Sequence, residues 1–132
     1  MEQSTERLRR YLEDELEECR AEDVEGRLTE LERLQDVVDA NRVEEHVALL
    51  SALANETRYR LVRALVAADG ELCVCELHPL VDVSESAVSH AMSALVQAGL
   101  VEGRKEGRWK KYRATDRATA LVTVLDEGAD DE

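Results

Sequence analysis

The stretch "VSESAVSHAMSALVQAGLVEGRKEGRWKKYRAT", residues 83–115, decides the fold of this 132-residue chain. Ser84 has the side chain of a helix N-cap, and Gly99 is the residue type that commonly follows the end of a helix. Between them the apolar residues recur at helical spacing: Val88, Met92, Leu95 and Val96. The first half of the stretch therefore predicts a helix with one buried face.

The second half, residues 102–113, predicts a β-hairpin with its turn at Lys105–Gly107. It holds all three lysines of the chain, and its six basic and two acidic residues give a net charge of +4. The whole chain carries −13, so the remaining residues carry −17. Such an acidic chain repels DNA, and the hairpin is therefore the candidate contact for a polyanion.

The face of the helix opposite its apolar residues is small, polar and almost uncharged, as a surface that approaches phosphates and base edges must be. On this helix we expect the DNA contacts to be Ser84, Ser86, Ser89, His90 and Ser93. On the hairpin we expect them to be Arg104, Lys105, Arg108, Lys110 and Lys111. Trp109 is expected to pack at the base of the hairpin rather than to stack on nucleic acid.

Helices are also predicted on both sides of this stretch. One helix begins after an Asn55 cap and closes at Gly70, and a last helix begins at residue 116. Residues 5–40 repeat leucines along a narrow stripe, with a break near Gly26, which fits either a seam between two copies or a packed helix hairpin. The order predicts a mainly α winged helix-turn-helix. Its parts are a helical, dimerising extension (1–42), a DNA-binding and sensor domain (43–126) and an acidic tail (127–132).

These residues resemble the ArsR/SmtB family of winged-helix, metal-responsive repressors over roughly residues 43–116. Three segments carry the resemblance: "LLSALANETRYRLVRALV", "ELCVCEL" and the stretch quoted first. The resemblance implies a homodimer that binds an inverted-repeat operator on double-stranded DNA and leaves it when a metal or metalloid binds. It also implies that the N- and C-terminal helices form the dimer interface.

Two of the three cysteines, Cys73 and Cys75, stand in "ELCVCEL" (71–77). Taken alone they fit a metal site, a redox pair or two small core residues. On a regular helix, side chains two residues apart diverge by about 200°. If this stretch is a helix, we therefore expect binding of one ion by both sulfurs to unwind or bend its start. If the stretch is extended, both side chains already share a face and the coupling to DNA needs another route.

By resemblance, Cys73 and Cys75 match the thiols with which family members bind arsenite, antimonite, cadmium or lead. His78 stands where a third cysteine is usual, so the third ligand is either Cys19 from the partner protomer or His78. Trivalent arsenic prefers three thiolates, whereas zinc and cadmium accept mixed sulfur and nitrogen donors. The expected inducer is arsenite or antimonite. The alternatives are a divalent ion (cadmium, lead or zinc), a redox signal, or a constitutive regulator with buried cysteines.

The remaining features limit the class of protein. Thirty acidic residues with three lysines suit a high-salt, halophilic cytoplasm, and the charged start with no long apolar run predicts no membrane segment. No organic cofactor is expected. No group that orients a nucleophile is visible, so an enzyme is not expected. The last helix lacks histidines, which opposes a metal site there despite Asp116, Asp126 and Glu127.

Overall fold

The computed structural model describes residues 2–16 and 20–130. It divides into two compact units, Met1–Val43 and Glu44–Glu132, each described here by itself. Within the described residues no helix is long and apolar enough to cross a membrane.

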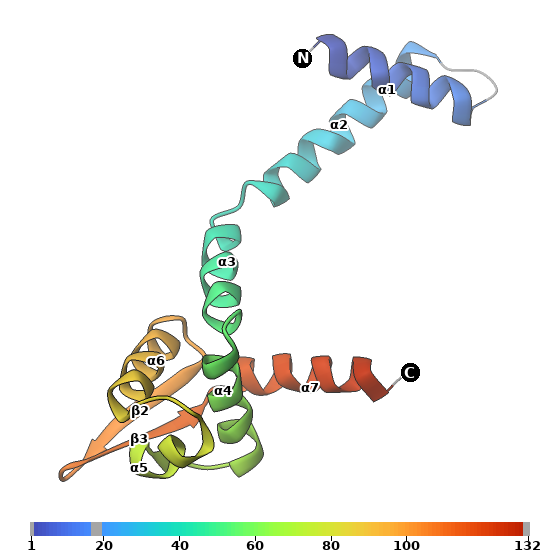
Figure 1. Cartoon of the computed structure of the whole chain (residues 1–132). Helices are drawn as coiled ribbons and strands as arrows, with labels where there is room; N and C mark the ends of the chain where they lie inside the picture. The colour runs from blue at the N-terminus through green and yellow to red at the C-terminus, as the bar shows by residue number, and fades with distance from the viewer. Residues whose placement is uncertain (1, 17–19, 131–132) are drawn as a thin grey trace. The chain divides into compact units, whose positions relative to one another are not determined.

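The first unit contains helices α1 (Glu2–Glu15) and α2 (Ala21–Val38) (Figure 1). Gly26 lies inside α2, so the break predicted near Gly26 is wrong. Arg20 is the extended residue before α2, and its backbone N–H donates to Asp23. Leu12 of α1 and Val24 of α2 are both buried, whereas Leu31 and Leu34, farther along α2, are exposed.

The second unit holds a helical core around a small sheet. Its helices are α3 (Arg42–Leu53), α4 (Glu56–Ala68), α5 (Val74–Leu77), α6 (Glu85–Gln97) and α7 (Asp116–Asp130), with a 3-10 turn, η1 (His78–Leu80). Its strands are β1 (Leu72–Cys73), β2 (Val101–Glu106) and β3 (Trp109–Ala114). Helix α7 continues to Asp130, so the predicted acidic tail is largely helical.

Local signals set most helix ends as predicted. The Asn55 side chain accepts a hydrogen bond from the Arg58 N–H, and the Ser84 hydroxyl accepts one from Ala87. Gly99 follows α6 with a φ of +80°, a conformation that favours glycine. The prediction that Gly70 closes α4 is wrong, because Asp69 takes the left-handed conformation there (φ 49°).

The three strands form an antiparallel sheet in the order β1–β3–β2. In the hairpin the pairs run from Val101 with Ala114 to Glu106 with Trp109. The turn is therefore Gly107–Arg108, which begins two residues and ends one residue later than predicted, with Gly107 at a φ of +63°. Strand β1 was not predicted; it carries Cys73.

The core lies where α4, α6 and α7 pack against one face of this sheet (Figure 1). Fully buried side chains include Leu61 and Leu65 of α4, Leu95 of α6 and Ala118 of α7. Tyr112 of β3, only 2 % exposed, joins the strands to this core. The predicted mainly α fold with a β-hairpin wing is confirmed.

Candidate functional site

The exposed face of α6 presents the polar residues predicted from the sequence. Val88, Met92 and Leu95 are fully buried, which turns the opposite side of the helix outward. The predicted contacts on that side are all exposed: Ser84, Ser86, Ser89, His90 and Ser93. The helix thus presents hydroxyl and imidazole groups to solvent, where a ligand can reach them.

The wing divides its cations between two faces. Directly opposed residues of an antiparallel pair share a face, so Lys105 and Lys110 lie on the face of Tyr112. This face meets α6: Lys110, Tyr112, Ser93 and Gln97 line one hollow of about 370 Å³. The Lys110 ammonium also lies 5.8 Å from the centre of the Tyr112 ring. Two wing cations therefore stand on the same side of the sheet as the polar face of α6.

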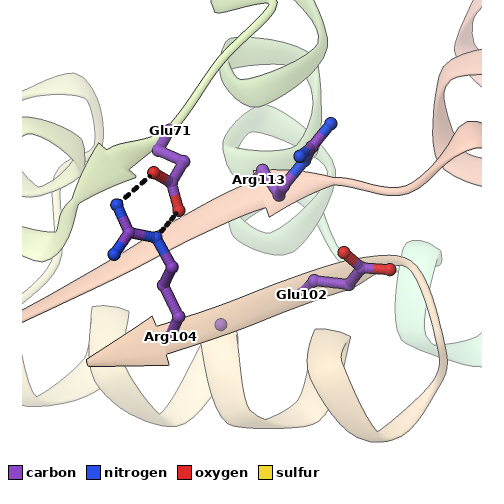
Figure 2. Close-up of a pocket in the computed structure, with 5 residues that line it drawn as sticks. Glu71, Glu102, Arg104 and Arg113 are labelled. Atoms are coloured by element: carbon purple, nitrogen blue, oxygen red, sulfur yellow. Dashed lines mark hydrogen bonds and ion pairs between the residues drawn. The ribbon is translucent and has the colours of Figure 1, made fainter. Parts of the chain in front are cut away.

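Arg104 and Lys111 lie on the other face of the wing, where carboxylates bind them. Arg104 donates two hydrogen bonds to Glu71, of 2.5 and 2.7 Å, and Figure 2 shows it reaching past β3 to do so. Lys111 forms a 2.8 Å ion pair with Glu106, which also accepts from Arg104 at 3.2 Å. These two cations are not brought beside α6.

The same contacts shift the protonation equilibria of their carboxyls. Hydrogen bonds from Arg104 hold the pKa of Glu71 below its ordinary value, and the ion pair with Lys111 does the same for the pKa of Glu106. Both carboxylates thus stay charged and keep neutralising this face of the wing.

The turn of the wing is exposed rather than packed. Arg108 lies in the turn, with its guanidinium 5.8 Å from the centre of the Trp109 ring. Trp109 is 52 % exposed and stands next to the turn, so the prediction that it packs at the base of the wing is wrong. Arg108 and Trp109 are both free to meet a partner that lies along the wing.

The thiols of Cys73 and Cys75 meet. Cys73 is the extended N-cap residue before α5 and Cys75 lies in its first turn, with their Cα atoms 5.2 Å apart and a disulfide between them. The prediction that the helix must unwind before both sulfurs can share a ligand is wrong, because Cys73 lies outside the helix. The backbone N–H of Cys73 donates to Glu76, which fixes this entry to α5.

The surroundings of the two cysteines differ. Cys73 is 7 % exposed and pairs in register with Lys111, whereas Cys75 is exposed. Cross-strand neighbours have Cβ atoms about 4.5–5.5 Å apart, so the side chain of Lys111 begins beside Cys73, while its ammonium is paired with Glu106. This basic neighbour could not be predicted from the sequence, because it lies 38 positions farther along the chain.

The candidate third ligands are not gathered with the two cysteines. Among the described residues there is no group of three or more His, Cys, Asp or Glu side chains able to hold a metal ion. The His78 Nε2 donates to the Val83 carbonyl at 3.0 Å, which ties η1 to the loop before α6. Cys19 lies outside the described residues.

Comparisons with known proteins agree with this geometry. Residues 55–103 match the model of the bacterial regulatory protein family arsR. A putative arsenical resistance operon repressor from Halobacterium salinarum is 54 % identical over 122 residues, which span 92 % of this chain and 95 % of the relative.

Two solved structures share the fold. HlyU from Vibrio cholerae is 33 % identical, with a TM-score of 0.59, covering 66 % of this chain and 94 % of HlyU. A homodimeric winged helix-turn-helix DNA-binding domain from Mycobacterium bovis is 26 % identical, with a TM-score of 0.58, covering 71 % and 89 %. The polar recognition face, the wing and the matched residues show that the chain belongs to the ArsR family, and it is a DNA-binding transcriptional regulator rather than an enzyme.

Proposed function

We propose that this protein represses an arsenic-resistance operon and releases its operator when arsenite or antimonite binds the reduced thiols of Cys73 and Cys75. The observation that carries this is the convergence of the two sulfurs immediately upstream of η1 and α6. Two sulfur donors that lie together at the start of α5 suit a thiophilic ion. The name of the Halobacterium relative supports the arsenical over a divalent metal.

On DNA, α6 is proposed to enter the major groove while the wing follows the phosphates. The wing contacts are then Lys105, Arg108 and Lys110, on the α6 side or at the turn. Arg104 and Lys111, held by carboxylates on the other face, contribute less. Two such units would read an inverted repeat.

The dimer is proposed to form through α3 and α7. Leu50 of α3 and Val124 and Leu125 of α7 are all more than half exposed, although they are apolar. Between the two helices lies a hollow of about 290 Å³ lined by Leu49, Leu50 and Leu121. A second copy that covers this surface removes apolar area from water, which favours association.

The N-terminal extension is proposed to add a second dimer contact. Only the first half of α2 is covered by α1, while Leu31, Leu34 and Val38 are 38–62 % exposed along one stripe. A matching stripe on a second copy is its natural cover. Such a pairing would bring the partner's Cys19 into the same assembly.

The test is operator binding by fluorescence anisotropy with the protein's own promoter fragment in molar salt. Native protein and the Cys73→Ser, Cys75→Ser and Cys19→Ser variants are titrated in reducing buffer, with and without arsenite, antimonite, cadmium and zinc. Release by arsenite that requires Cys73 and Cys75 supports the proposal. Loss of release in Cys19→Ser makes Cys19 the third ligand, and unchanged release excludes it. DNA binding that no ion affects would leave a constitutive regulator.

A redox signal is the second candidate, because the structure joins Cys73 to Cys75 and pairs Cys73 with Lys111. The thiolate is the reactive form of a cysteine, and two thiols this close in the chain can be oxidised to the disulfide. In this reaction the two thiols give two electrons and two protons to a small-molecule disulfide, which becomes two thiols. Operator release by such a disulfide, without any ion and lost in Cys75→Ser, would favour this candidate.

A further inference from the structure

The strand that carries Cys73 is linked to the wing by side chains as well as by backbone pairing. In register, Cys73 of β1 lies beside Lys111 of β3, and Lys111 lies beside Arg104 of β2. The three residues form one row across the sheet, on the face away from the core. A displacement of Cys73 therefore acts in a row that includes one residue from each hairpin strand.

Glu71, just before β1, is joined by its side chain to Arg104, the β2 member of this row. It stands two residues before Cys73, and its carboxylate accepts two of the three hydrogen bonds that the Arg104 guanidinium donates; Arg104 comes from the far strand of the sheet (Figure 2). Paired fork-like contacts of this kind have a fixed geometry and are stronger than single hydrogen bonds. Because β1 has only two residues and two register pairs, the ion pair adds a side-chain link to a short backbone pairing.

A ligand at Cys73 and Cys75 acts on the same short segment. Both hydrogen bonds to Arg104 are at or below 2.7 Å, and an N–H···O bond is lost beyond about 3.2–3.5 Å. Moving the Glu71 carboxylate about 1 Å away from the Arg104 guanidinium therefore lengthens both contacts to about 3.5 Å or more and breaks the pair. Arg104 also contacts Glu106, the partner of Lys111, so the break reaches the outer end of the wing.

We propose that Glu71 is a positioning residue that couples the thiol pair to the wing through Arg104. The Glu71–Arg104 pair holds the wing in its operator-binding orientation, and occupation of the thiols by the inducer releases it. This inference rests on the proposed function, and it names the contact through which the inducer acts. The pair has two discrete states, formed and broken, which is what a coupling element requires.

The test compares native protein with Glu71→Gln, which keeps the side-chain size and removes the charge. Glu56→Gln is the matched control, because Glu56 pairs with Arg60 on α4, away from the sheet. A charge swap, Glu71→Arg with Arg104→Glu, restores the pair in reverse. For each reduced protein in molar salt, operator affinity is measured with and without arsenite, and bound arsenite is measured by equilibrium dialysis.

The wing also contains a reporter for the DNA-free protein. Trp109, the only tryptophan of the chain, pairs with Glu106 in the hairpin and is half exposed. Arsenite is expected to shift its emission in native protein and in Glu56→Gln. In Glu71→Gln the shift should disappear although arsenite still binds. If Glu71 had a purely structural role, its replacement would not abolish the shift in Trp109 emission while leaving arsenite binding intact.

The expected result is that Glu71→Gln reduces the arsenite-dependent loss of operator affinity by about threefold or more, and that the charge swap restores it. An unchanged arsenite effect in Glu71→Gln overturns the inference and leaves the proposed function intact. The inference is also overturned if Glu71→Gln lowers operator affinity by the same factor with and without arsenite. If native protein binds its operator and ignores arsenite, the proposed function fails and the inference fails with it.

Discussion

Replacing Gly103 by alanine should destabilise the wing from within. A Cβ at this position would lie 2.9 Å from Cε1 and 3.1 Å from Cδ1 of Tyr112, its partner across the hairpin. A Cβ contact below 3.0 Å essentially never occurs, so the ring must shift, and Tyr112 is only 2 % exposed in a packed core. Overpacking a core by one carbon costs typically about 1–3 kcal/mol. We expect Gly103→Ala to lower the free energy of unfolding by that amount.

The measurement is urea unfolding at constant molar salt, followed by far-ultraviolet circular dichroism. Gly128→Ala is the matched control, because Gly128 lies in α7 of the same unit with no atom within 4 Å of the added Cβ. It should leave stability unchanged or slightly raise it, since alanine is the better helix former. Displacing Tyr112 also disturbs Lys110, which stacks on its ring, so Gly103→Ala should weaken operator binding as well. Equal unfolding midpoints for the two variants would refute the reasoning.

Three further predictions concern single side chains. Lys110→Ala should weaken binding to all DNA sequences alike, because a wing lysine contacts phosphates rather than bases. The effect should exceed that of Lys111→Ala, because Lys110 lies on the α6 side of the wing whereas the Lys111 ammonium is paired with Glu106. Anisotropy with operator and with unrelated DNA measures both effects. Asn55→Ala removes the cap of α4 and should cost about 1 kcal/mol, seen as a lower thermal midpoint. Leu50→Glu places a charge on the exposed apolar face of α3 and should shift the dimer toward monomer, measured by light scattering after size exclusion.

What could be predicted from the sequence depended on how local its signal was. The caps at Asn55 and Ser84 and the glycine after α6 act within four residues, so a short window of sequence contains both partners. The polar face of α6 followed from helical spacing alone. These features positioned the recognition helix correctly.

Features whose partners are distant in the chain could not be predicted. Strand β1 has two residues, too few for an alternating pattern, and it exists because β3 pairs with it 38 positions later. The Glu71–Arg104 contact spans 33 positions. Two sulfurs that should diverge on a helix meet because Cys73 is an extended cap residue, and that depends on β1. The division of the wing cations into two faces follows from a register that the turn position determines, and that turn was predicted to begin two residues too early.

This division predicts how operator binding depends on salt. The logarithm of affinity falls with the logarithm of salt concentration with a slope of about −0.9 for each phosphate neutralised. If all five predicted wing contacts reached phosphates in both protomers, the slope would be about −9. With Arg104 and Lys111 held by carboxylates, three contacts per protomer remain and the slope should be about −5.

Anisotropy titrations over a range of molar potassium chloride measure this slope. At about 1 M salt the Debye length is about 3 Å, so the chain's charge of −13 repels DNA little and distant attraction is equally weak. Affinity must then come from short contacts, and the exposed, almost uncharged polar face of α6 is expected to supply them. A slope near −9 would contradict this reasoning, since it would mean that DNA displaces Glu71 and Glu106 and takes Arg104 and Lys111 for itself. Glu71→Gln makes the distinction sharper: it removes the main carboxylate partner of Arg104, leaves the contact with Glu106, and does not alter α6. It should steepen the slope only if Arg104 can reach a phosphate.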